Sequence, residues 1–271
     1  MSRNSDAFTG IADRDSRSIA DAFAGRKAFI AYLMAGDPNL ETSGRYILAA
    51  QEAGADLIEV GIPFSDPIAE GEVIIAASAR ALAAGTRLDG VFAMLESLQG
   101  RLRVPLVFMT YLNPVFAYGY ERFCARSAEV GVSGLIIPDL PFEEQGELKP
   151  VARRFGLEVV SLVAPTSAER VLRIAEDAEG FIYLVSSLGV TGMRSGVSDH
   201  VSALVAAVRQ VSTVPVAVGF GISTPEQAAF YAAMADGVIV GSAIVDIVGR
   251  YGEEAEPYLV EYIAGMKAGL G

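Results

Sequence analysis

The sequence predicts an α/β protein built as one eight-stranded barrel. Short apolar runs alternate with amphipathic helical stretches along the 271 residues, and this alternation is typical of parallel strands joined by helices. We count eight such runs. Eight βα units in about 250 residues fit a closed (β/α)8 TIM barrel better than an open doubly wound sheet. Because no linker rich in Pro, Gly or Ser divides the chain, we expect a single domain over residues 1–271.

The predicted strands are apolar throughout, as expected when both faces of a parallel sheet are covered. They lie at residues 28–33, 57–60, 105–109, 135–137, 159–163, 181–185, 214–218 and 238–240. The predicted helices lie at residues 41–53, 73–84, 88–98, 120–130, 142–155, 168–178, 200–211 and 225–234. Four glycines fall between a predicted helix and the next strand, where a left-handed C-cap is needed: Gly54, Gly131, Gly156 and Gly180.

Two segments add to the simple repeat. Residues 1–25 precede the first strand and include a helix candidate at 16–23, so we expect an N-terminal helical extension that caps the barrel floor. The interval between the second and third strands holds two helix candidates, 73–84 and 88–98, where the repeat needs one. We therefore expect extra helices around the barrel.

Composition excludes several function classes. The chain has 21 Lys and Arg against 33 Asp and Glu, and its net charge of −12 argues against nucleic acid or an anionic membrane as a partner. The single cysteine, Cys124, permits no intramolecular disulfide and is typical of a reducing compartment. The polar N-terminus lacks the apolar centre of a signal peptide, and no apolar run approaches the roughly 18 residues of a membrane span. We expect a cytoplasmic protein.

The chemistry should depend on carboxylates without a metal. His200 is the only histidine, which nearly removes His-based metal sites and Ser-His-Asp triads. Glu59 is the leading candidate because it lies among apolar residues at the end of a predicted buried strand. Burial raises the pKa of a carboxyl, and a carboxyl that titrates near neutrality can both give and take protons. The strand alone fits equally well a glutamate paired with a buried arginine or with loop backbone.

Active sites of such barrels lie at the C-terminal ends of the strands. Polar and aromatic side chains follow most of the predicted strands: Tyr32, Asp37, Asp66, Glu70, Tyr111, Asn113, Asp139 and Tyr183. Some of these segments also fit purely structural roles. The acidic loop at 63–72 fits a solvated turn stiffened by two prolines, Tyr183 and Phe220 fit barrel filling, and Thr191 fits an ordinary cap.

Three glycine-containing turns near the C-terminal end of the chain predict a phosphate site. They lie at residues 186–192, 219–223 and 241–245, and glycine lets backbone N–H groups approach an anion closely. A helix that begins behind Gly241 would offer its N–H groups, its partial positive charge and the Ser242 hydroxyl. Phosphate sites after strands seven and eight recur in TIM barrels. Arg194 is the nearest basic residue, so backbone would bind the anion.

Several long motifs occur together in one order along the chain. They are residues 29–38 (FIAYLMAGDP), 59–67 (EVGIPFSDP), 138–141 (PDLP), 188–192 (LGVTG), 219–223 (GFGIS) and 241–245 (GSAIV). On these motifs, which span about residues 28–248, the chain closely resembles the tryptophan synthase alpha subunit family. The resemblance implies a TIM barrel that cleaves indole-3-glycerol phosphate by a retro-aldol reaction, yielding indole and glyceraldehyde 3-phosphate in the last stage of L-tryptophan biosynthesis. It also implies an α2β2 heterotetramer with a beta subunit that holds PLP, and no cofactor in this chain.

The resemblance also assigns roles to individual residues. Glu59 matches the general acid/base that protonates indole C3 and accepts the glycerol hydroxyl proton, and Glu70 matches the second acid, which hydrogen-bonds the indole N–H. The other matches are Gly192, Gly221, Gly241 and Ser242 at the phosphate; Tyr32, Tyr183 and Phe220 in the indole pocket; Thr191 in the closing loop; and Asp66, Pro67 and Asn113 facing the beta subunit.

The chain departs from the family pattern at three positions. Glu70 stands where the family normally has Asp, which moves the acid by about one carbon–carbon bond, and a misplacement near 1 Å can cost on the order of 10²-fold in rate. Glu72 replaces a proline, which predicts a more flexible loop and like-charge repulsion on Glu70. Ser187 stands where some relatives carry Arg. Restoring the usual acid with Glu70→Asp is expected to keep or raise activity.

Two alternative functions fit parts of the same sequence. The first is a catalytically weak barrel that acts mainly as an allosteric activator of the beta subunit, because Glu70 and Glu72 alter the active-site loop. The second is another phosphate-sugar barrel, such as an indole-glycerol-phosphate synthase or a phosphoribosyl isomerase. The synthase needs a lysine at a C-terminal strand end, whereas Lys27, Lys149 and Lys267 all fall elsewhere in the predicted pattern.

Overall fold

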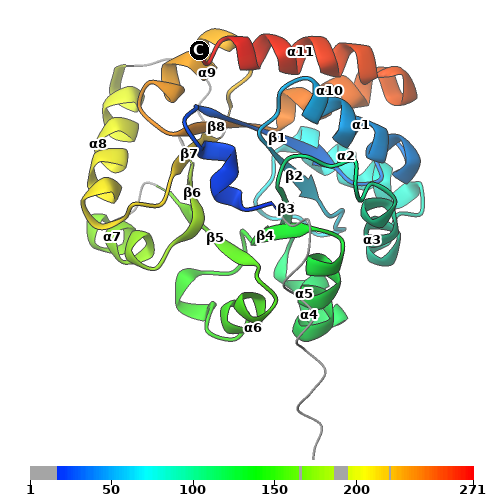
Figure 1. The fold of residues 1–271 in the computed structure, drawn as a ribbon, viewed down its shortest axis with the longest axis horizontal. Helices are drawn as coiled ribbons and strands as arrows, with labels where there is room; N and C mark the ends of the chain where they lie inside the picture. The colour runs from blue at the N-terminus through cyan, green and yellow to red at the C-terminus, as the bar shows by residue number, and fades with distance from the viewer. Residues whose placement is uncertain (1–16, 165–166, 186–194, 220) are drawn as a thin grey trace, which may run out of the picture.

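Eight parallel strands form a closed barrel in the order of the chain (Figure 1). The structure, a computed structural model, describes residues 17–164, 167–185, 195–219 and 221–271. The strands are β1 (Ala28–Met34), β2 (Leu57–Gly61), β3 (Leu106–Met109), β4 (Val132–Ile136), β5 (Glu158–Val163), β6 (Glu179–Val185), β7 (Val216–Gly219) and β8 (Gly237–Val240). The predicted fold class is therefore confirmed, and every predicted strand overlaps an observed one.

The boundaries of β4 differ most from the prediction. This strand begins at Val132, whereas the apolar run predicts a start at residue 135. Gly134 interrupts the apolar pattern, and its place in the barrel explains why. A Cβ atom there would lie 2.7 Å from the backbone oxygen of Glu158 on the next strand, so the close approach of the two strands requires glycine.

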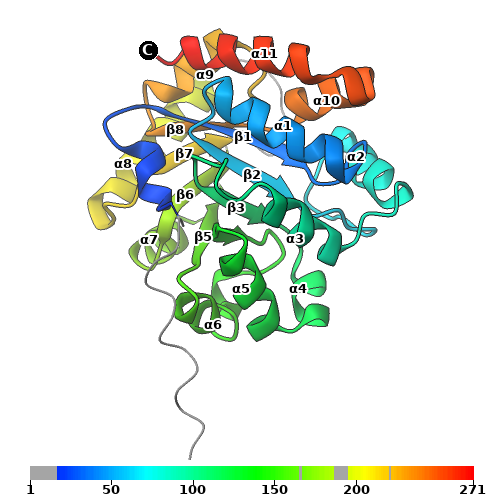
Figure 2. The same cartoon turned by 45° about the vertical axis from the view of Figure 1, so that its right-hand side comes forward.

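Helices surround the barrel, and most of them match the predicted stretches. The helices are α1 (Leu40–Glu52), α2 (Glu72–Ala83), α3 (Leu88–Ser97), α4 (Leu112–Tyr118), α5 (Tyr120–Glu129), α6 (Lys149–Arg154), α7 (Ala168–Glu176), α8 (Ser195–Val211), α9 (Pro225–Ala232), α10 (Ser242–Tyr251) and α11 (Glu256–Ala268). Figure 2 shows α1, α10 and α11 packed side by side along the outside of β1 and β8. None of the helices within the described ranges has both the length and the hydropathy for crossing a bilayer.

Two predicted helices are wrong in extent. The stretch at 142–155 is a short 3-10 helix, η2 (Phe142–Glu144), followed by the separate helix α6. Pro150 lies in the first turn of α6, where its missing N–H is tolerated, whereas in the middle of a longer helix it would break a hydrogen bond. The N-terminal candidate at 16–23 is a 3-10 helix, η1 (Ile19–Phe23), with Ser18 as its N-cap.

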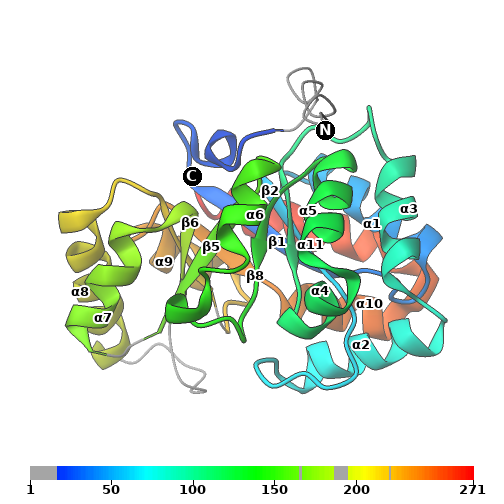
Figure 3. The same cartoon turned by 90° about the horizontal axis from the view of Figure 1, so that it is seen from below.

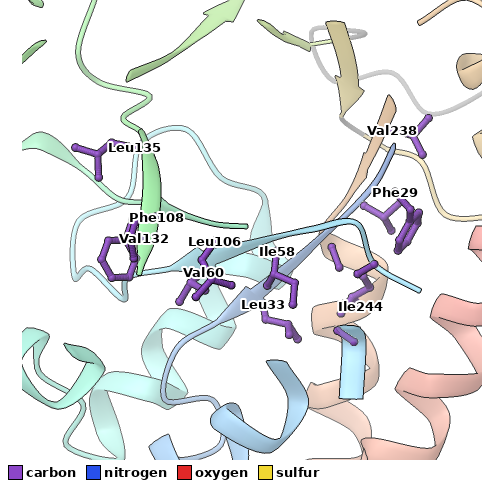
Figure 4. Close-up of a cluster of buried hydrophobic side chains, with 14 of the residues drawn as sticks. Phe29, Leu33, Ile58, Val60, Leu106, Phe108, Val132, Leu135, Val238 and Ile244 are labelled. Atoms are coloured by element: carbon purple, nitrogen blue, oxygen red, sulfur yellow. The ribbon is translucent and has the colours of Figure 1, made fainter. Parts of the chain in front are cut away.

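Side chains on the strands alternate between the barrel interior and the layer of helices. On β2, Leu57 belongs to the interior cluster, whereas Ile58 and Val60 pack in the outer one. Figure 4 shows Ile58 and Val60 beside Leu33 and Leu106 in this outer cluster. Because successive strand residues point to opposite faces, Glu59 shares the interior side with Leu57.

The two ends of the barrel differ in content. At the N-terminal ends of the strands, Ile19 of η1 is fully buried in the interior cluster, and the rings of Phe23 and Phe181 lie 5.8 Å apart. Figure 3 shows η1 at this end and the loop that leads into α2 at the opposite end. The catalytic candidates of the sequence lie at the opposite, C-terminal end.

Candidate active site

Glu59 lies inside the barrel, two positions before the end of β2. The residue is 1% exposed, and neither carboxylate oxygen has a hydrogen-bond partner among the residues that the structure describes. Burial raises its pKa to about 8. The described part of the chain therefore contains no arginine or backbone partner for Glu59, which leaves the acid/base interpretation as the one with structural support.

Two buried tyrosines lie near Glu59. Tyr32 is its register partner on β1, and Tyr183 points into the interior from β6. Burial, followed by the charges of Glu70 and Glu59, raises the pKa of Tyr32 well above its ordinary value. Burial and then the charge of Glu59 do the same for Tyr183. Each charge acts over a short range, so the structure brings both acids and both tyrosines into one region.

Glycines at the strand ends make room for these tyrosine rings. A Cβ atom on Gly219, the last residue of β7, would lie 2.6 Å from the Tyr183 hydroxyl oxygen. A Cβ atom on Gly61, the last residue of β2, would overlap the hydroxyl of Tyr32. Each ring thus lies across the end of a neighbouring strand.

Glu70 lies in the loop between β2 and α2 and contacts Tyr111. Its Oε2 accepts a hydrogen bond from the Tyr111 hydroxyl. Glu70, Tyr32 and Tyr111 line one small cavity of about 10 Å³, together with Met109 and other residues. Burial raises the pKa of Glu70, and the charge of Asp139 adds to this, whereas hydrogen bonds from the backbone of Glu70 and Ala69 oppose it.

The prediction that like-charge repulsion on Glu70 comes from Glu72 is wrong. The repulsion that acts on Glu70 comes from Asp139, after burial, and not from Glu72. Glu72 is the exposed first residue of α2, where a negative charge is favourable at a helix N-terminus. The loop also has fixed points, because the Ser78 hydroxyl both accepts from and donates to the backbone of Phe64, at 2.8 Å each.

Part of the predicted phosphate site can be described. Gly241 is the N-cap of α10 and Ser242 is its first residue, so N–H groups of the first helical turn lack intrahelical partners. Gly221 is exposed and has a φ of 78°, a conformation that favours glycine. Gly192, Thr191, Phe220 and Ser187 lie outside the described residues.

Two acids at strand ends have structural partners. Asp37 is 3% exposed and accepts hydrogen bonds from Arg80 Nε and Nη2 at 2.9 and 2.7 Å, which ties the end of β1 to α2. Asp139 accepts a 2.8 Å hydrogen bond from the backbone N–H of Leu112 and so fixes the start of α4. These contacts support the site without placing either acid in the reaction.

Comparison with known proteins identifies the family. The family model described as tryptophan synthase alpha chain matches residues 20–268. The chain belongs to this family. It is 49% identical to the tryptophan synthase alpha chain of Lacticaseibacillus casei over 252 residues, covering 93% of this chain and 95% of that relative. Over 90% of this chain and 97% of the other, its structure is similar to the alpha subunit of Campylobacter jejuni, with a TM-score of 0.82 and 34% identity.

A second solved structure is described as the tryptophan synthase a2b2 complex of Pyrococcus furiosus. The similarity has a TM-score of 0.79 and 36% identity, and it covers 89% of this chain and 97% of that one. The resemblance found in the sequence motifs is thereby confirmed. As a member of this family, the protein is a carbon–carbon lyase that cleaves indole-3-glycerol phosphate in tryptophan biosynthesis.

The phosphate-sugar barrel alternative is not supported, because the synthase reaction needs a lysine at the C-terminal end of a strand and none lies there. Lys27 precedes β1 and donates to the backbone oxygen of Ala235 at 2.7 Å, Lys149 lies in α6, and Lys267 lies in α11. No other lysine occurs in the chain. The lyase assignment is therefore consistent with both the family and the site.

A larger cavity lies at the wrong end of the barrel for this chemistry. It has a volume of about 820 Å³ and is lined by Phe23, Arg26, Lys27, Arg209, Asp236 and other residues. Its basic side chains already have partners, such as Asp236 for Arg209 at 2.8 Å. Since TIM-barrel enzymes work at the C-terminal ends of their strands, size alone is misleading here.

The structure adds two features to the site predicted from the sequence. Tyr111 has no assigned role in the sequence motifs, yet its hydroxyl reaches Glu70. Asp66 and Asn113 are exposed and Pro67 is partly exposed, as expected for a partner-facing surface. Close to them in the chain, Ile68 is 80% exposed and Phe116 is 67% exposed. For Ile68, a large apolar side chain in a polar loop was the available sequence signal of its exposure.

Proposed function

We propose that Glu59 is the general acid/base of the lyase reaction. It first donates its proton to C3 of the indole ring, which leaves a carboxylate and a cationic indolenine. The carboxylate then takes the proton of the hydroxyl on the adjacent glycerol carbon. As the carbonyl forms, the bond to C3 breaks and its electron pair returns to the ring, which yields indole and glyceraldehyde 3-phosphate. Glu59 is again protonated at the end of the cycle.

One observation supports this role above the others. Glu59 is buried without a partner among the described residues, and its pKa of about 8 keeps it mostly protonated at neutral pH. The first step needs a proton donor, and the second needs the base that the first step has created. A pKa near the working pH suits both steps, whereas an ordinary exposed glutamate would already have lost its proton.

Glu70 is assigned to the ring nitrogen. An ionised carboxylate there would hydrogen-bond the indole N–H and stabilise the positive charge that develops during protonation of C3. The proximity of Glu70 and Glu59 to Tyr32 supports this arrangement, because one tyrosine hydroxyl senses both charges. Tyr32, Tyr183 and Phe220 would enclose the ring, and Thr191 would belong to the closing loop.

The phosphate group is assigned to the glycine turns after β6, β7 and β8. Gly241 and Ser242 at the start of α10 and the left-handed Gly221 support this assignment, and Gly192 completes the set proposed from the motifs. Holding the phosphate far from the reacting bond would orient the substrate without stabilising one state of the reaction over another.

The partner is assigned to the exposed apolar surface beside the active-site loop. Ile68 and Phe116, with Asp66, Pro67 and Asn113, would face a beta subunit that holds PLP in an α2β2 heterotetramer, in which the indole passes to the partner. The alpha chain itself would need no cofactor. We place this assembly in the cytoplasm, and we treat residues 1–271 as one domain.

The substitution Glu59→Gln tests the proposal. The amide keeps the size of the side chain but has no proton to give at C3, so indole release should fall by roughly 10²- to 10⁴-fold, alone and with the beta subunit. Glu158→Gln is the matched control, since Glu158 is another partly buried glutamate with a raised pKa but begins β5 at the opposite end of the barrel.

Retained turnover by Glu59→Gln would refute the acid/base role. If the wild-type chain itself released no indole in either condition yet still stimulated the partner, the protein would be an activator and the enzymatic assignment would fail.

A further inference from the structure

The hydroxyl of Tyr111 binds three groups of the active-site loop at once. It accepts hydrogen bonds from the backbone N–H of Ile68 at 2.9 Å and of Ala69 at 2.8 Å. It donates its own proton to the carboxylate of Glu70. Three consecutive loop residues are therefore held by a single side-chain atom from the end of β3.

The hydrogen-bond capacity of a tyrosine hydroxyl makes its contact with Glu70 favour one protonation state of the carboxyl. The oxygen has one proton to donate and two lone pairs that accept. Both lone pairs are occupied by backbone N–H groups, so the hydroxyl can act toward Glu70 only as a donor. A donor favours the ionised carboxylate over the acid, because hydrogen bonds to a charged acceptor are roughly twice as strong as neutral ones.

Tyr111 is itself fixed on several sides. It is 3% exposed and directly precedes α4, whose first N–H group is bound by Asp139. Its ring packs against Phe64 with the centroids 5.2 Å apart. A rigid side chain loses little entropy when it binds the loop, so the position of its hydroxyl determines the position of Glu70.

We propose that Tyr111 is a positioning residue for the lyase reaction, which holds loop residues 68–70 and keeps the Glu70 carboxylate ionised beside Tyr32. The inference rests on the proposed role of Glu70 at the indole N–H. It gives a reason for the glutamate at this position, because the longer side chain is the one seen to reach the hydroxyl. Burial and the charge of Asp139 favour the protonated form, which cannot accept the ring N–H as strongly, and the Tyr111 hydroxyl adds to the backbone hydrogen bonds of Glu70 and Ala69 that act against them.

The direct test removes the hydroxyl and keeps the ring. Tyr111→Phe should lower kcat by roughly 10- to 100-fold with KM changed by less than about threefold, because the loss concerns charge stabilisation in the reaction. The acid limb of the kcat–pH profile should move to higher pH, since the lost hydrogen bond had stabilised the anion of Glu70. Tyr118→Phe is the matched control: its hydroxyl also donates to a carboxylate, Asp89 Oδ1 at 2.8 Å, but on the exposed outer side.

The same Tyr111→Phe substitution made in a Glu70→Gln protein distinguishes positioning of the Glu70 carboxylate from general disruption of the loop. In Glu70→Gln the carboxylate is absent, so adding Tyr111→Phe should cost only a few-fold in kcat and leave the pH profile unmoved. An equal loss in both backgrounds, or an unshifted acid limb in Tyr111→Phe, would overturn the proposal. Neither result would affect the role of Glu59, which Glu59→Gln tests independently.

Replacement of Tyr111 by 3-fluorotyrosine covers the case in which Tyr111→Phe folds poorly. The fluorinated phenol is the stronger donor and has nearly the same shape, so the acid limb should move to lower pH than in the wild type. A movement in the opposite direction, or none, would contradict the proposal.

Discussion

At the scale of single residues, the most consequential feature is a carboxyl that is buried with no partner. Glu59 is 1% exposed and its two oxygens have no hydrogen bond among the described residues, which destabilises the folded state whenever the group is ionised. Perturbed buried carboxyls of this kind cluster at functional sites. The folded protein therefore carries a stability penalty at Glu59, and the size of this penalty should depend on pH.

Replacing Glu59 should change how stability varies with pH. Between about pH 5 and pH 8 the unfolded chain has this carboxyl ionised, whereas the folded chain keeps it protonated because its pKa is raised to about 8. The folded state then binds more protons, so the free energy of unfolding falls as the pH rises through this window. Glu59→Gln lacks this titration and should gain stability relative to wild type by up to about 1.4 kcal/mol per pH unit.

Urea unfolding of both proteins at several pH values measures this difference. A stability difference that stays constant from pH 5 to pH 8 would mean that Glu59 titrates normally in the folded protein.

Shortening the second acid should reduce activity. The motif comparison alone predicts equal or higher activity for Glu70→Asp, but in the structure the glutamate reaches the Tyr111 hydroxyl. An aspartate would end about one carbon–carbon bond short, and a misplacement near 1 Å can cost on the order of 10²-fold in rate. We expect kcat for indole release to fall at least 10-fold. Activity at or above the wild-type level would show that the loop adapts to either acid.

The sequence pointed to some site residues and missed the role of others. Glu59 was recognisable because an acid inside an apolar strand needs a special reason. The role of Tyr111 was not recognisable, because it arises where a loop folds back onto the end of β3, and contacts across 41 residues of sequence leave no local pattern. The effect of the Asp139 charge on the pKa of Glu70 was not recognisable for the same reason.

At the scale of helices and strands, periodicity predicted the barrel and failed at interruptions. Gly134 lies in β4 where the next strand approaches closely, and Pro150 lies in the first turn of α6, where its missing N–H is tolerated; both interrupted the pattern. The seven-residue α4 is too short for a helical period to show, and it follows β3 almost directly. Turn glycines were reliable: Gly54, Gly131 and Gly156 all have the positive φ that the C-cap prediction requires.

The glycine at the end of β7 should be sensitive to substitution. In Gly219→Ala the new Cβ would lie 2.6 Å from the Tyr183 hydroxyl oxygen, so the Tyr183 ring must shift from its position. We expect kcat/KM for indole-3-glycerol phosphate to fall roughly 10-fold or more, because the ring is proposed to line the indole pocket.

Gly265→Ala in α11 is the control, since its Cβ would meet nothing within 4 Å and alanine favours a helix. The Gly265→Ala variant should have the kcat/KM of the wild type and a slightly higher midpoint of thermal unfolding. A loss of the same size in both variants would exclude a specific effect on Tyr183.

At the scale of the whole molecule, the barrel separates stability from chemistry. Its floor is closed by Ile19 and Phe23 of η1, whereas the opposite end holds the acids, the tyrosines and the start of α10. The same end presents Ile68 and Phe116 to solvent, and we propose that these two side chains belong to the surface that binds the beta subunit.

Polar substitution on this surface should weaken assembly. Phe116→Ser removes a large apolar side chain that is 67% exposed, and we expect the Kd for the beta subunit to rise at least 10-fold. Titration calorimetry measures the affinity. Val260→Ser on α11, 38% exposed, should leave it unchanged. If the Phe116 variant binds as tightly as wild type, the partner docks elsewhere.

The central claim is that Glu59 is held protonated inside the barrel at neutral pH. Infrared titration of its carboxyl, taken as the difference between wild type and Glu59→Gln, measures this directly in the folded protein. We expect a midpoint near pH 8, with the protonated carboxyl band still strong at pH 7. A midpoint near 4.5, the ordinary value for a glutamate, would contradict it.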